Sequence, residues 1–182
     1  MNLFKKFGAE SKLIPLPDGN PIVYGCFKAV NNVLVNKDLN AQQKKVENTT
    51  RILWYGHYDV IEANENDGWE TDPFDLTAQD GYLYGRGVTD NKGPLLAAIY
   101  SVAELVKLNQ LNSDIVFIIE GEEECGSFGF QNVIQQNKQL IGNIDWILLS
   151  NSYWLDDNTP CLNYGLRGVI SASVSISSDK PD

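Results

Sequence analysis

A histidine and an aspartate two residues apart are the first side chains in this sequence that could bind a metal ion. His57 is the only histidine among 182 residues, and it stands in Gly-His-Tyr-Asp at residues 56–59, directly after an apolar run. An imidazole can ligate a metal, and a carboxylate such as Asp59 can fix the orientation of the ring. The alternative is a histidine at a strand end that ordinary hydrogen bonds satisfy. With one histidine, a metal site would need mostly carboxylate ligands.

A glycine-rich turn at residues 85–94 holds the second candidate. Asp90 lies at its tip, and glycines let the backbone turn tightly and approach a ligand closely. An aspartate just before a helix is also a good N-cap, so a purely structural role is the alternative.

Three consecutive glutamates, Glu122, Glu123 and Glu124, form the third candidate, and they follow the apolar run 115–119 closely. Such a run is often a solvated face or favourable charge at a helix N-terminus. Adjacent carboxylates at the end of a buried strand, however, repel one another unless a cation or a proton neutralises them. This position therefore favours a functional site.

The elements that must position these side chains can be predicted from the apolar pattern. Residues 51–56, 115–119 and 144–149 are apolar runs typical of buried strands, and helical spacing follows Pro94 up to residue 108. Alternating strands and helices indicate an α/β fold with a layered sheet. In such sheets ligands bind beyond the carboxyl ends of the strands, where polar residues, including Asn151 after the third run, would meet.

The rest of the chain gives weaker predictions. They are a short helix ending near residue 7, an extended segment at 14–21, a β-rich segment at 22–35, a polar surface loop at 37–50, an irregular segment at 60–80, a short strand at 82–87, a helix at 128–140 and a strand at 169–177.

Composition limits the classes of binding partner and the cellular location that we expect. The net charge is -10, from 14 Lys and Arg against 24 Asp and Glu, which argues against nucleic acid or an anionic membrane as the main partner. No apolar run approaches the ~18 residues of a membrane helix, and residues 1–6 lack the apolar stretch of a signal peptide. Three cysteines without a Cys-x-x-Cys pair fit thiols in a reducing compartment, so we expect a cytoplasmic protein.

Taken in order, the polar segments resemble the dinuclear zinc metallopeptidases of the carnosine dipeptidase, aminoacylase and carboxypeptidase G type, peptidase family M20. The segments that carry the resemblance are residues 56–60, 69–74, 85–94, 120–127, and 153–154 with 164–168. Within the family the chain is most similar to cytosolic non-specific dipeptidases and to the peptidase-like subunit of the fungal glutathione-degradation complex.

The resemblance implies a role for each candidate residue. His57 would bind one metal, Asp90 would bridge two, and Glu124 would bind the second. Glu123 would be the general base that takes a proton from the metal-activated water, and Asp59 would orient His57. The peptide bond that follows Asp90 would be cis.

The resemblance also implies the fold, the cofactors and the reaction. The fold would be a three-layer α/β/α catalytic domain with a central, mostly parallel sheet of the zinc-exopeptidase type. Two divalent metal ions would bind, zinc in the first place, with manganese or cobalt as alternatives. The reaction would be amide hydrolysis in dipeptides or small peptides, including γ-glutamyl or glutathione-type peptides, by a homodimer or a hetero-complex.

Two departures from the family pattern bear on activity. The family has an aspartate ligand where this chain has Asn151, a neutral and weaker ligand for a hard cation. Residues 1–182 would form a partial catalytic domain, incomplete at its C-terminal side, without the dimerisation domain and the returning segment that supplies the last histidine. We therefore expect weak metal binding and little activity from residues 1–182 alone.

Two alternatives stay open at this point. One is a catalytically impaired, peptidase-like subunit that supports a partner enzyme in glutathione or peptide breakdown. The other is a truncated product whose uncovered sheet edges and apolar surface prevent a stable fold.

Overall fold

The computed structural model describes residues 1–30, 49–152, 154–156 and 158–178. The chain divides into two units, residues 1–151 and the residues from 152 onward. The first unit contains every helix and every strand of the described residues.

A five-stranded sheet forms the centre of the first unit. Its strands stand in the order β1 (Glu10–Ile14), β2 (Ile22–Phe27), β6 (Asp114–Glu120), β3 (Arg51–His57) and β7 (Trp146–Leu149). β3 is parallel to both β6 and β7, whereas β2 is antiparallel to both β1 and β6. Only β2 therefore runs against the other strands, and the sheet is mostly parallel.

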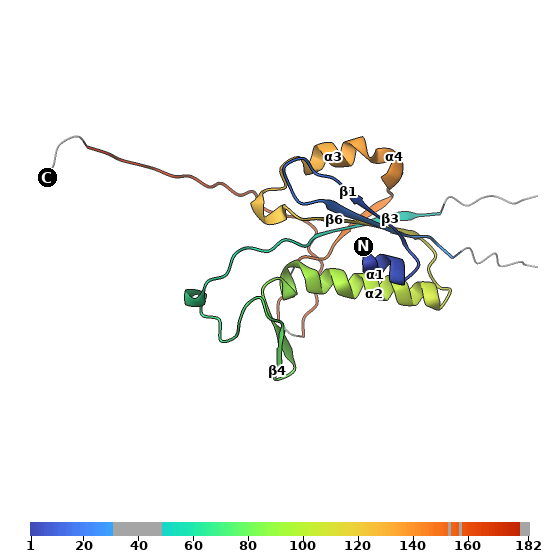
Figure 1. The fold of residues 1–182 in the computed structure, drawn as a ribbon, viewed down its shortest axis with the longest axis horizontal. Coiled ribbons are helices and arrows are strands. Elements are labelled where there is room, and N and C mark those ends of the chain that lie inside the picture. Colours follow the sequence, from blue (N-terminus) through green and yellow to red (C-terminus); the bar gives the residue numbers. More distant parts are fainter. Residues whose placement is uncertain (31–48, 153, 157, 179–182) are drawn as a thin grey trace, which may run out of the picture. The chain divides into compact units, whose positions relative to one another are not determined.

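Helices cover both faces of this sheet (Figure 1). On one face lie α1 (Asn2–Lys6) and α2 (Gly93–Lys107), and on the other lie α3 (Phe130–Gln136) and α4 (Lys138–Ile141). The predicted three-layer α/β/α fold is thus confirmed.

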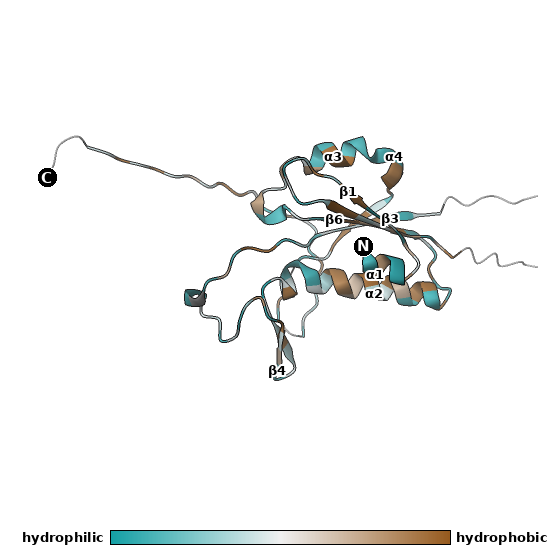
Figure 2. Ribbon diagram, in the orientation of Figure 1, coloured by the Kyte–Doolittle hydropathy of each residue, from teal (hydrophilic) through white to brown (hydrophobic). Residues whose placement is uncertain are grey.

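The middle strand β6 supplies side chains to two apolar cores, because successive residues of a strand point to opposite faces. Phe117 and Ile119 pack in the core beneath α1 and α2, whereas Val116 and Ile118 pack in the core beneath α3 and α4. In Figure 2 the strands between the two layers of helices are mostly brown, the colour of hydrophobic residues. Buried on both faces, β6 reads as a continuous apolar run, as central parallel strands do.

The remaining elements of the first unit are short and lie between the longer strands and helices in the sequence. They are η1 (Glu65–Asp67), the hairpin of β4 (Thr77–Gln79) and β5 (Tyr82–Tyr84), the π-helical turn η2 (Val88–Lys92) and η3 (Glu123–Cys125). Asp90 departs from helical geometry inside η2, at φ -117° and ψ 94°. The preceding Gly87 has a φ of +85°, a conformation that glycine adopts without strain.

The predicted first helix, the strands in 51–56 and 115–119, and the helix after Pro94 are confirmed. The segment 128–140, predicted as one helix, is instead two short helices, α3 and α4. They meet at Asn137, whose φ of -104° and ψ of 18° lie outside the helical range. The Asn137 side chain bonds the carbonyl of Val133, the kind of local hydrogen bond with which asparagine competes with a helix. The strand β1 was not predicted.

The third apolar run forms a strand, but the prediction that it is buried is wrong. Exposures along β7 range from 42% at Leu148 to 69% at Ile147. β7 is the last strand in the sheet order and pairs only with β3 among the described residues, so one edge and much of its surface meet solvent.

The predicted strand at 169–177 is also wrong. These residues have no regular structure, and apolar side chains such as Ile170 and Ile176 are 95% and 94% exposed. Alternation is necessary for a half-buried strand, but a strand forms only where a neighbour accepts its backbone hydrogen bonds. The second unit contains, among its described residues, only an isolated bridge between Asp156 and Thr159.

Most of the predicted loop at 37–50 and the end of the β-rich segment at 22–35 lie outside the described residues. In the described part of the chain no helix has the length and apolarity to span a membrane.

At the end of the sheet opposite the polar clusters, Asp114 joins three segments. Its carboxylate accepts hydrogen bonds from Arg51 Nη1 at 2.7 Å, Lys28 Nζ at 2.9 Å and the backbone N of Ala29 at 2.9 Å. Burial alone raises the pKa of Asp114, but the hydrogen bonds and the two positive charges outweigh it, so the pKa lies below its ordinary value.

Asp114→Asn is expected to lower the free energy of unfolding by about 1–3 kcal/mol at neutral pH, since the half-buried Arg51 loses its counter-charge. A carboxylate with a depressed folded-state pKa contributes stability above its unfolded pKa and loses it as the pH falls through the folded one. The difference between wild type and variant should therefore shrink below about pH 4. Urea unfolding across this range measures it, with the exposed Asp75→Asn as control. A difference that did not change with pH would contradict the assignment.

Candidate metal centre

The parallel strands β3, β6 and β7 end at the same edge of the sheet, and the polar segments follow these ends. His57 closes β3 and is the register partner of Glu120, which closes β6. Tyr55 of β3 pairs with Leu149, so Ser150 and Asn151 follow β7 at the same edge. The predicted convergence is therefore observed, because parallel strands deliver their carboxyl ends together.

Three candidate ligands from separate segments gather at this edge. One potential ligand atom each from His57, Asp90 and Glu124 lies within 4.8 Å of the others. Nε2 of His57 is 2.8 Å from Oδ1 of Asp90. They are the one group of at least three such side chains found among the described residues.

The His57 ring is held from both sides. Nδ1 lies 3.2 Å from the Asp59 carbonyl oxygen, and Nε2 faces Asp90. Burial lowers the pKa of His57, but the hydrogen bond that the ring makes to Asp90, the charges of Glu123 and Asp90, and the Asp59 carbonyl raise it above its usual value. Both nitrogens thus face oxygen acceptors, an environment that favours a positive charge at the ring.

Asp59 links the His57 strand to the glutamate segment. Its Oδ1 is 3.2 Å from Nδ1 of His57, and its Oδ2 accepts a hydrogen bond from the backbone N of Glu124 at 2.9 Å. The His57 ring makes its hydrogen bond with the backbone carbonyl of Asp59. The side-chain oxygen Oδ1 of Asp59 has no hydrogen-bond partner among the described residues. One aspartate therefore contacts two of the candidate ligand residues.

Glu123 lies at the edge of the cluster, with Oε2 4.0 Å from Nε2 of His57 and the side chain 40% exposed. Burial is the largest cause that raises the pKa of Glu123. The charges of Glu124, Asp90 and Asp59 raise it further, against the opposing effect of His57. A partly exposed carboxylate with a raised pKa can accept a proton from a nearby water and release it again.

Asn151 reaches the same cluster through its amide. Its Nδ2 donates to Oδ1 of Asp90 at 3.1 Å and lies 3.5 Å from Nε2 of His57. To ligate a cation at this point, Asn151 would have to turn its amide so that the oxygen faces inward.

Two residues that the sequence did not single out support the cluster. Asn91, which is 1% exposed, accepts a hydrogen bond from the backbone N of His57 at 3.2 Å and donates to the Ser150 carbonyl at 3.0 Å. It thereby joins the ends of β3 and β7. A Cβ at Gly56 would come within 2.5 Å of Oδ1 of Asn91, so this approach needs glycine. The peptide bond between Asp90 and Asn91 is cis, as expected.

Glu122 does not face the cluster. Its Oε1 accepts hydrogen bonds from the backbone N of Asn20 at 2.7 Å and from the Asn20 side chain at 2.8 Å, and Asn20 also donates to the Gly121 carbonyl. The first glutamate of the three therefore anchors the segment. Glu122 differs from Glu123 and Glu124 because it contacts Asn20, which is distant in the sequence. The sequence around Glu122 does not indicate this contact.

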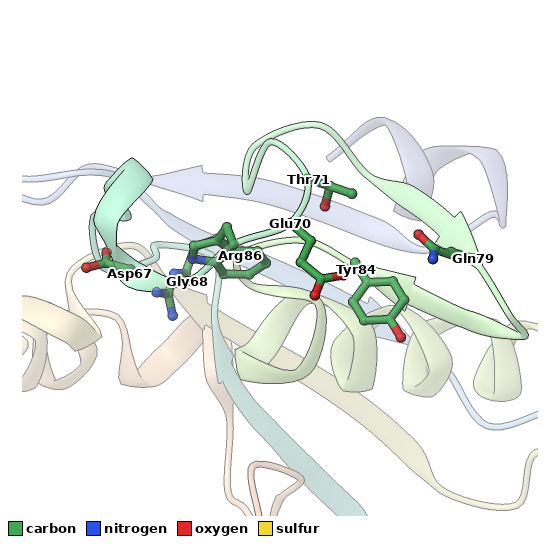
Figure 3. A pocket seen from close by; sticks show the side chains of 8 residues that line it. Asp67, Gly68, Glu70, Thr71, Gln79, Tyr84 and Arg86 are labelled. Carbon is green, nitrogen blue, oxygen red and sulfur yellow. The ribbon is translucent and has the colours of Figure 1, made fainter.

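A cavity of the first unit lies away from this cluster. It has a volume of about 520 Å³ and lies beside the β4–β5 hairpin, where its lining includes Glu70, Gln79, Tyr84 and Arg86 (Figure 3). The guanidinium of Arg86 lies 5.4 Å from the centre of the Trp69 ring. None of the candidate ligands lines this cavity.

The donor set fits a divalent cation. One imidazole nitrogen and two carboxylates are ligands that zinc, manganese and cobalt accept. A cation beside Nε2 of His57 would also balance the negative charges of Asp90, Glu123 and Glu124. In the described cluster, the His57 ring is the only group that can carry a compensating positive charge.

Comparisons of the sequence with a family model and with known proteins all find peptidases. The model of a family described as peptidase family M20/M25/M40 matches residues 53–163. The chain is 54% identical over 183 residues to the probable di- and tripeptidase DUG2 of Saccharomyces cerevisiae. The aligned region covers 99% of this chain and 20% of DUG2. The chain is 40% identical over 122 residues to the Cys-Gly metallodipeptidase DUG1 of the same yeast, covering 64% and 25%.

The fold is similar to that of a solved structure. Human carnosine dipeptidase 1 superposes with a TM-score of 0.66 at 33% identity, over 85% of this chain and 31% of that one. The chain thus spans about a fifth of DUG2, a quarter of DUG1 and a third of the human structure.

Proposed function

This chain belongs to peptidase family M20/M25/M40, and from that premise we propose that it carries most of the metal centre and the general base of a metal-dependent peptidase. The observation that carries the proposal is the cluster of His57, Asp90 and Glu124 with Glu123 at its edge. The closeness of these four side chains, which come from three separate segments of the chain, supports the proposal.

The proposed centre would hold two divalent ions, with zinc as the first choice. His57 would hold one ion, Glu124 would hold the other and Asp90 would contribute to both. Asp59 keeps the His57 ring in place and, through its bond to the Glu124 backbone, keeps the two ligands at a set separation. Divalent ions supply Lewis-acid polarisation of the scissile carbonyl and make a water easier to deprotonate.

Glu123 moves the proton in this proposal. Its carboxylate takes a proton from the attacking water and later gives it to the amine of the leaving group, as the C–N bond breaks. The raised pKa of Glu123, caused first by burial and then by neighbouring carboxylates, brings it closer to the neutral range in which both transfers are favourable.

The proposed substrates are dipeptides and other small peptides, including γ-glutamyl or glutathione-type peptides. The names of the similar yeast proteins, a probable di- and tripeptidase and a Cys-Gly metallodipeptidase, support this class. We further propose a cytoplasmic location and assembly as a homodimer or a hetero-complex.

The test is hydrolysis by the full-length protein loaded with Zn²⁺ or Mn²⁺. Cys-Gly, β-Ala-His and a γ-glutamyl dipeptide are the substrates. Turnover that a chelator removes and added metal restores is expected with at least one of them. Absence of turnover with every metal and substrate in a folded protein would overturn the proposal.

Asn151 favours a second candidate, a peptidase-like subunit with impaired catalysis that supports a partner enzyme. A neutral amide stands where the family has a carboxylate ligand, and it donates a hydrogen bond to Asp90 instead of offering its oxygen. On this reading the centre binds metal weakly. Two tightly bound ions in the unmodified full-length protein would exclude it.

Asn151→Asp is expected to strengthen Zn²⁺ binding about 10-fold or more, because it adds a charged oxygen ligand. The same change places a second carboxylate beside Asp90, so it should lower the melting temperature without metal and raise it with metal. Isothermal calorimetry and thermal melts measure both effects. Asn132→Asp, on the exposed side of α3, adds the same charge away from the centre and should change neither. An unchanged affinity in Asn151→Asp would contradict the assignment of this position.

A further inference from the structure

Glu120 is a fully buried carboxylate that the proposed mechanism does not use. It is the last residue of β6 and is 0% exposed. Taking a carboxylate out of water is costly unless hydrogen bonds compensate. The burial of this carboxylate next to a cluster of candidate ligands therefore suggests that Glu120 has a specific role.

Two hydroxyl groups converge on one oxygen of Glu120. Oε1 accepts a hydrogen bond from Tyr55 Oη at 2.5 Å and another from Ser127 Oγ at 2.9 Å. Burial, followed by the hydrogen bond and charge of Glu120, raises the pKa of Tyr55, so its hydroxyl stays a donor. The other oxygen, Oε2, has no hydrogen-bond partner among the described residues.

The two donors come from segments that carry candidate site residues. Tyr55 lies two residues before His57 on β3, and its ring makes an edge contact with Phe130 of α3 at 5.8 Å. This contact restricts the ring and aims its hydroxyl at Glu120.

Ser127 closes the loop that contains Glu123 and Glu124. Its backbone N donates to the Glu122 carbonyl at 2.7 Å, and its side chain returns to Glu120 at the start of the loop. Ser127 has a φ of +55°, a conformation uncommon for a serine, which its two hydrogen bonds help to hold. The Glu120–Ser127 bond therefore joins the two ends of the loop.

We propose that Glu120 is a positioning residue of the metal centre, which ties the strand of His57 to the loop of Glu123 and Glu124 through one shared oxygen. The carboxylate touches no reacting atom in this proposal. It acts by keeping the general base and a ligand at the separation that His57 requires, since small misplacements of such groups are costly to catalysis. Its effect on turnover rests on the proposed function, whereas its effect on metal affinity does not.

Two substitutions separate positioning from charge. Glu120→Gln keeps an oxygen that can accept from both hydroxyls, and Glu120→Leu removes it at similar volume. In the full-length protein, Glu120→Leu is expected to lower kcat by about 10–100-fold with little change in KM, and to weaken Zn²⁺ binding by a similar factor. Glu120→Gln should restore both to within about 3-fold of wild type. Glu104→Gln, on the exposed face of α2, is the matched control and should behave as wild type.

Isothermal calorimetry with Zn²⁺ and steady-state kinetics on the same preparations provide the readouts. If Glu120→Leu does not fold, Ser127→Ala removes one of the two bonds and is expected to weaken Zn²⁺ binding by about 3–10-fold. Wild-type affinity in a folded Glu120→Leu or Ser127→Ala protein, or equal loss in Glu120→Gln and Glu120→Leu, would overturn the proposal. If the wild type hydrolyses no peptide, the proposed function fails, while the Zn²⁺ affinities still decide the role of Glu120.

Discussion

Glu123→Gln is expected to lower kcat for dipeptide hydrolysis about 10²–10⁴-fold in the full-length, metal-loaded protein. Glutamine has nearly the same shape, but its amide cannot take a proton from the attacking water. Metal affinity should change little, because Glu123 stands at the edge of the cluster, 4.0 Å from Nε2 of His57, while His57, Asp90 and Glu124 form its centre. Kinetics and calorimetry on one preparation separate the two effects.

The neighbouring Glu122→Gln is the control for this result. Glu122 accepts hydrogen bonds from Asn20 and is not one of the three clustered side chains, and a glutamine oxygen can accept the same hydrogen bonds. Its kcat should stay within a few fold of wild type, roughly what the loss of one charged hydrogen bond permits. Equal loss in both variants would mean that the segment tolerates no change, and near wild-type turnover in Glu123→Gln would remove it as the base.

Asp90→Asn is expected to weaken Zn²⁺ binding at least about 100-fold and to reduce turnover with it, since the proposed bridging position would contribute to the binding of both ions. In the described cluster Asp90 contacts both His57 and Asn151. It accepts from Nε2 of His57 at 2.8 Å and from Nδ2 of Asn151 at 3.1 Å. An asparagine there removes the negative charge that would attract the proposed metal ions and leaves the shape of the side chain almost unchanged.

A second aspartate provides the comparison. Asp80 lies in the turn of the β4–β5 hairpin at a φ of +51°, where asparagine is equally tolerated. Asp80→Asn should bind Zn²⁺ as the wild type does. If Asp90→Asn kept full affinity, the metal would have to bind without this carboxylate, and the proposed centre would be wrong.

The parts of the site that could be predicted are those that follow a long apolar run. His57 ends β3 and the glutamates follow β6, and both strands are continuous apolar runs in the sequence, so strand ends and candidate ligands could be predicted together. Asp90 was found because a glycine turn before a helix is a local signal. In each case the information lies within about ten residues of the ligand.

The parts that could not be predicted depend on contacts between distant segments. Glu120 and Asn91 bond to residues 65 and 34 positions away, and nothing in their own neighbourhoods marks those bonds. The same reason explains the errors at the C-terminal end. The apolar pattern at 144–149 and the alternation at 169–177 are compatible with burial, but burial also needs a covering element, which neither segment has among the described residues.

The central claim is that His57, Asp90 and Glu124, far apart in the sequence, bind divalent metal together. Anomalous diffraction at the zinc edge, from crystals of the full-length protein grown with Zn²⁺, tests it directly. We expect density within about 2.0–2.2 Å of Nε2 of His57 and of carboxylate oxygens of Asp90 and Glu124. Crystals whose zinc peaks all lie beyond bonding distance of these three residues would contradict the account.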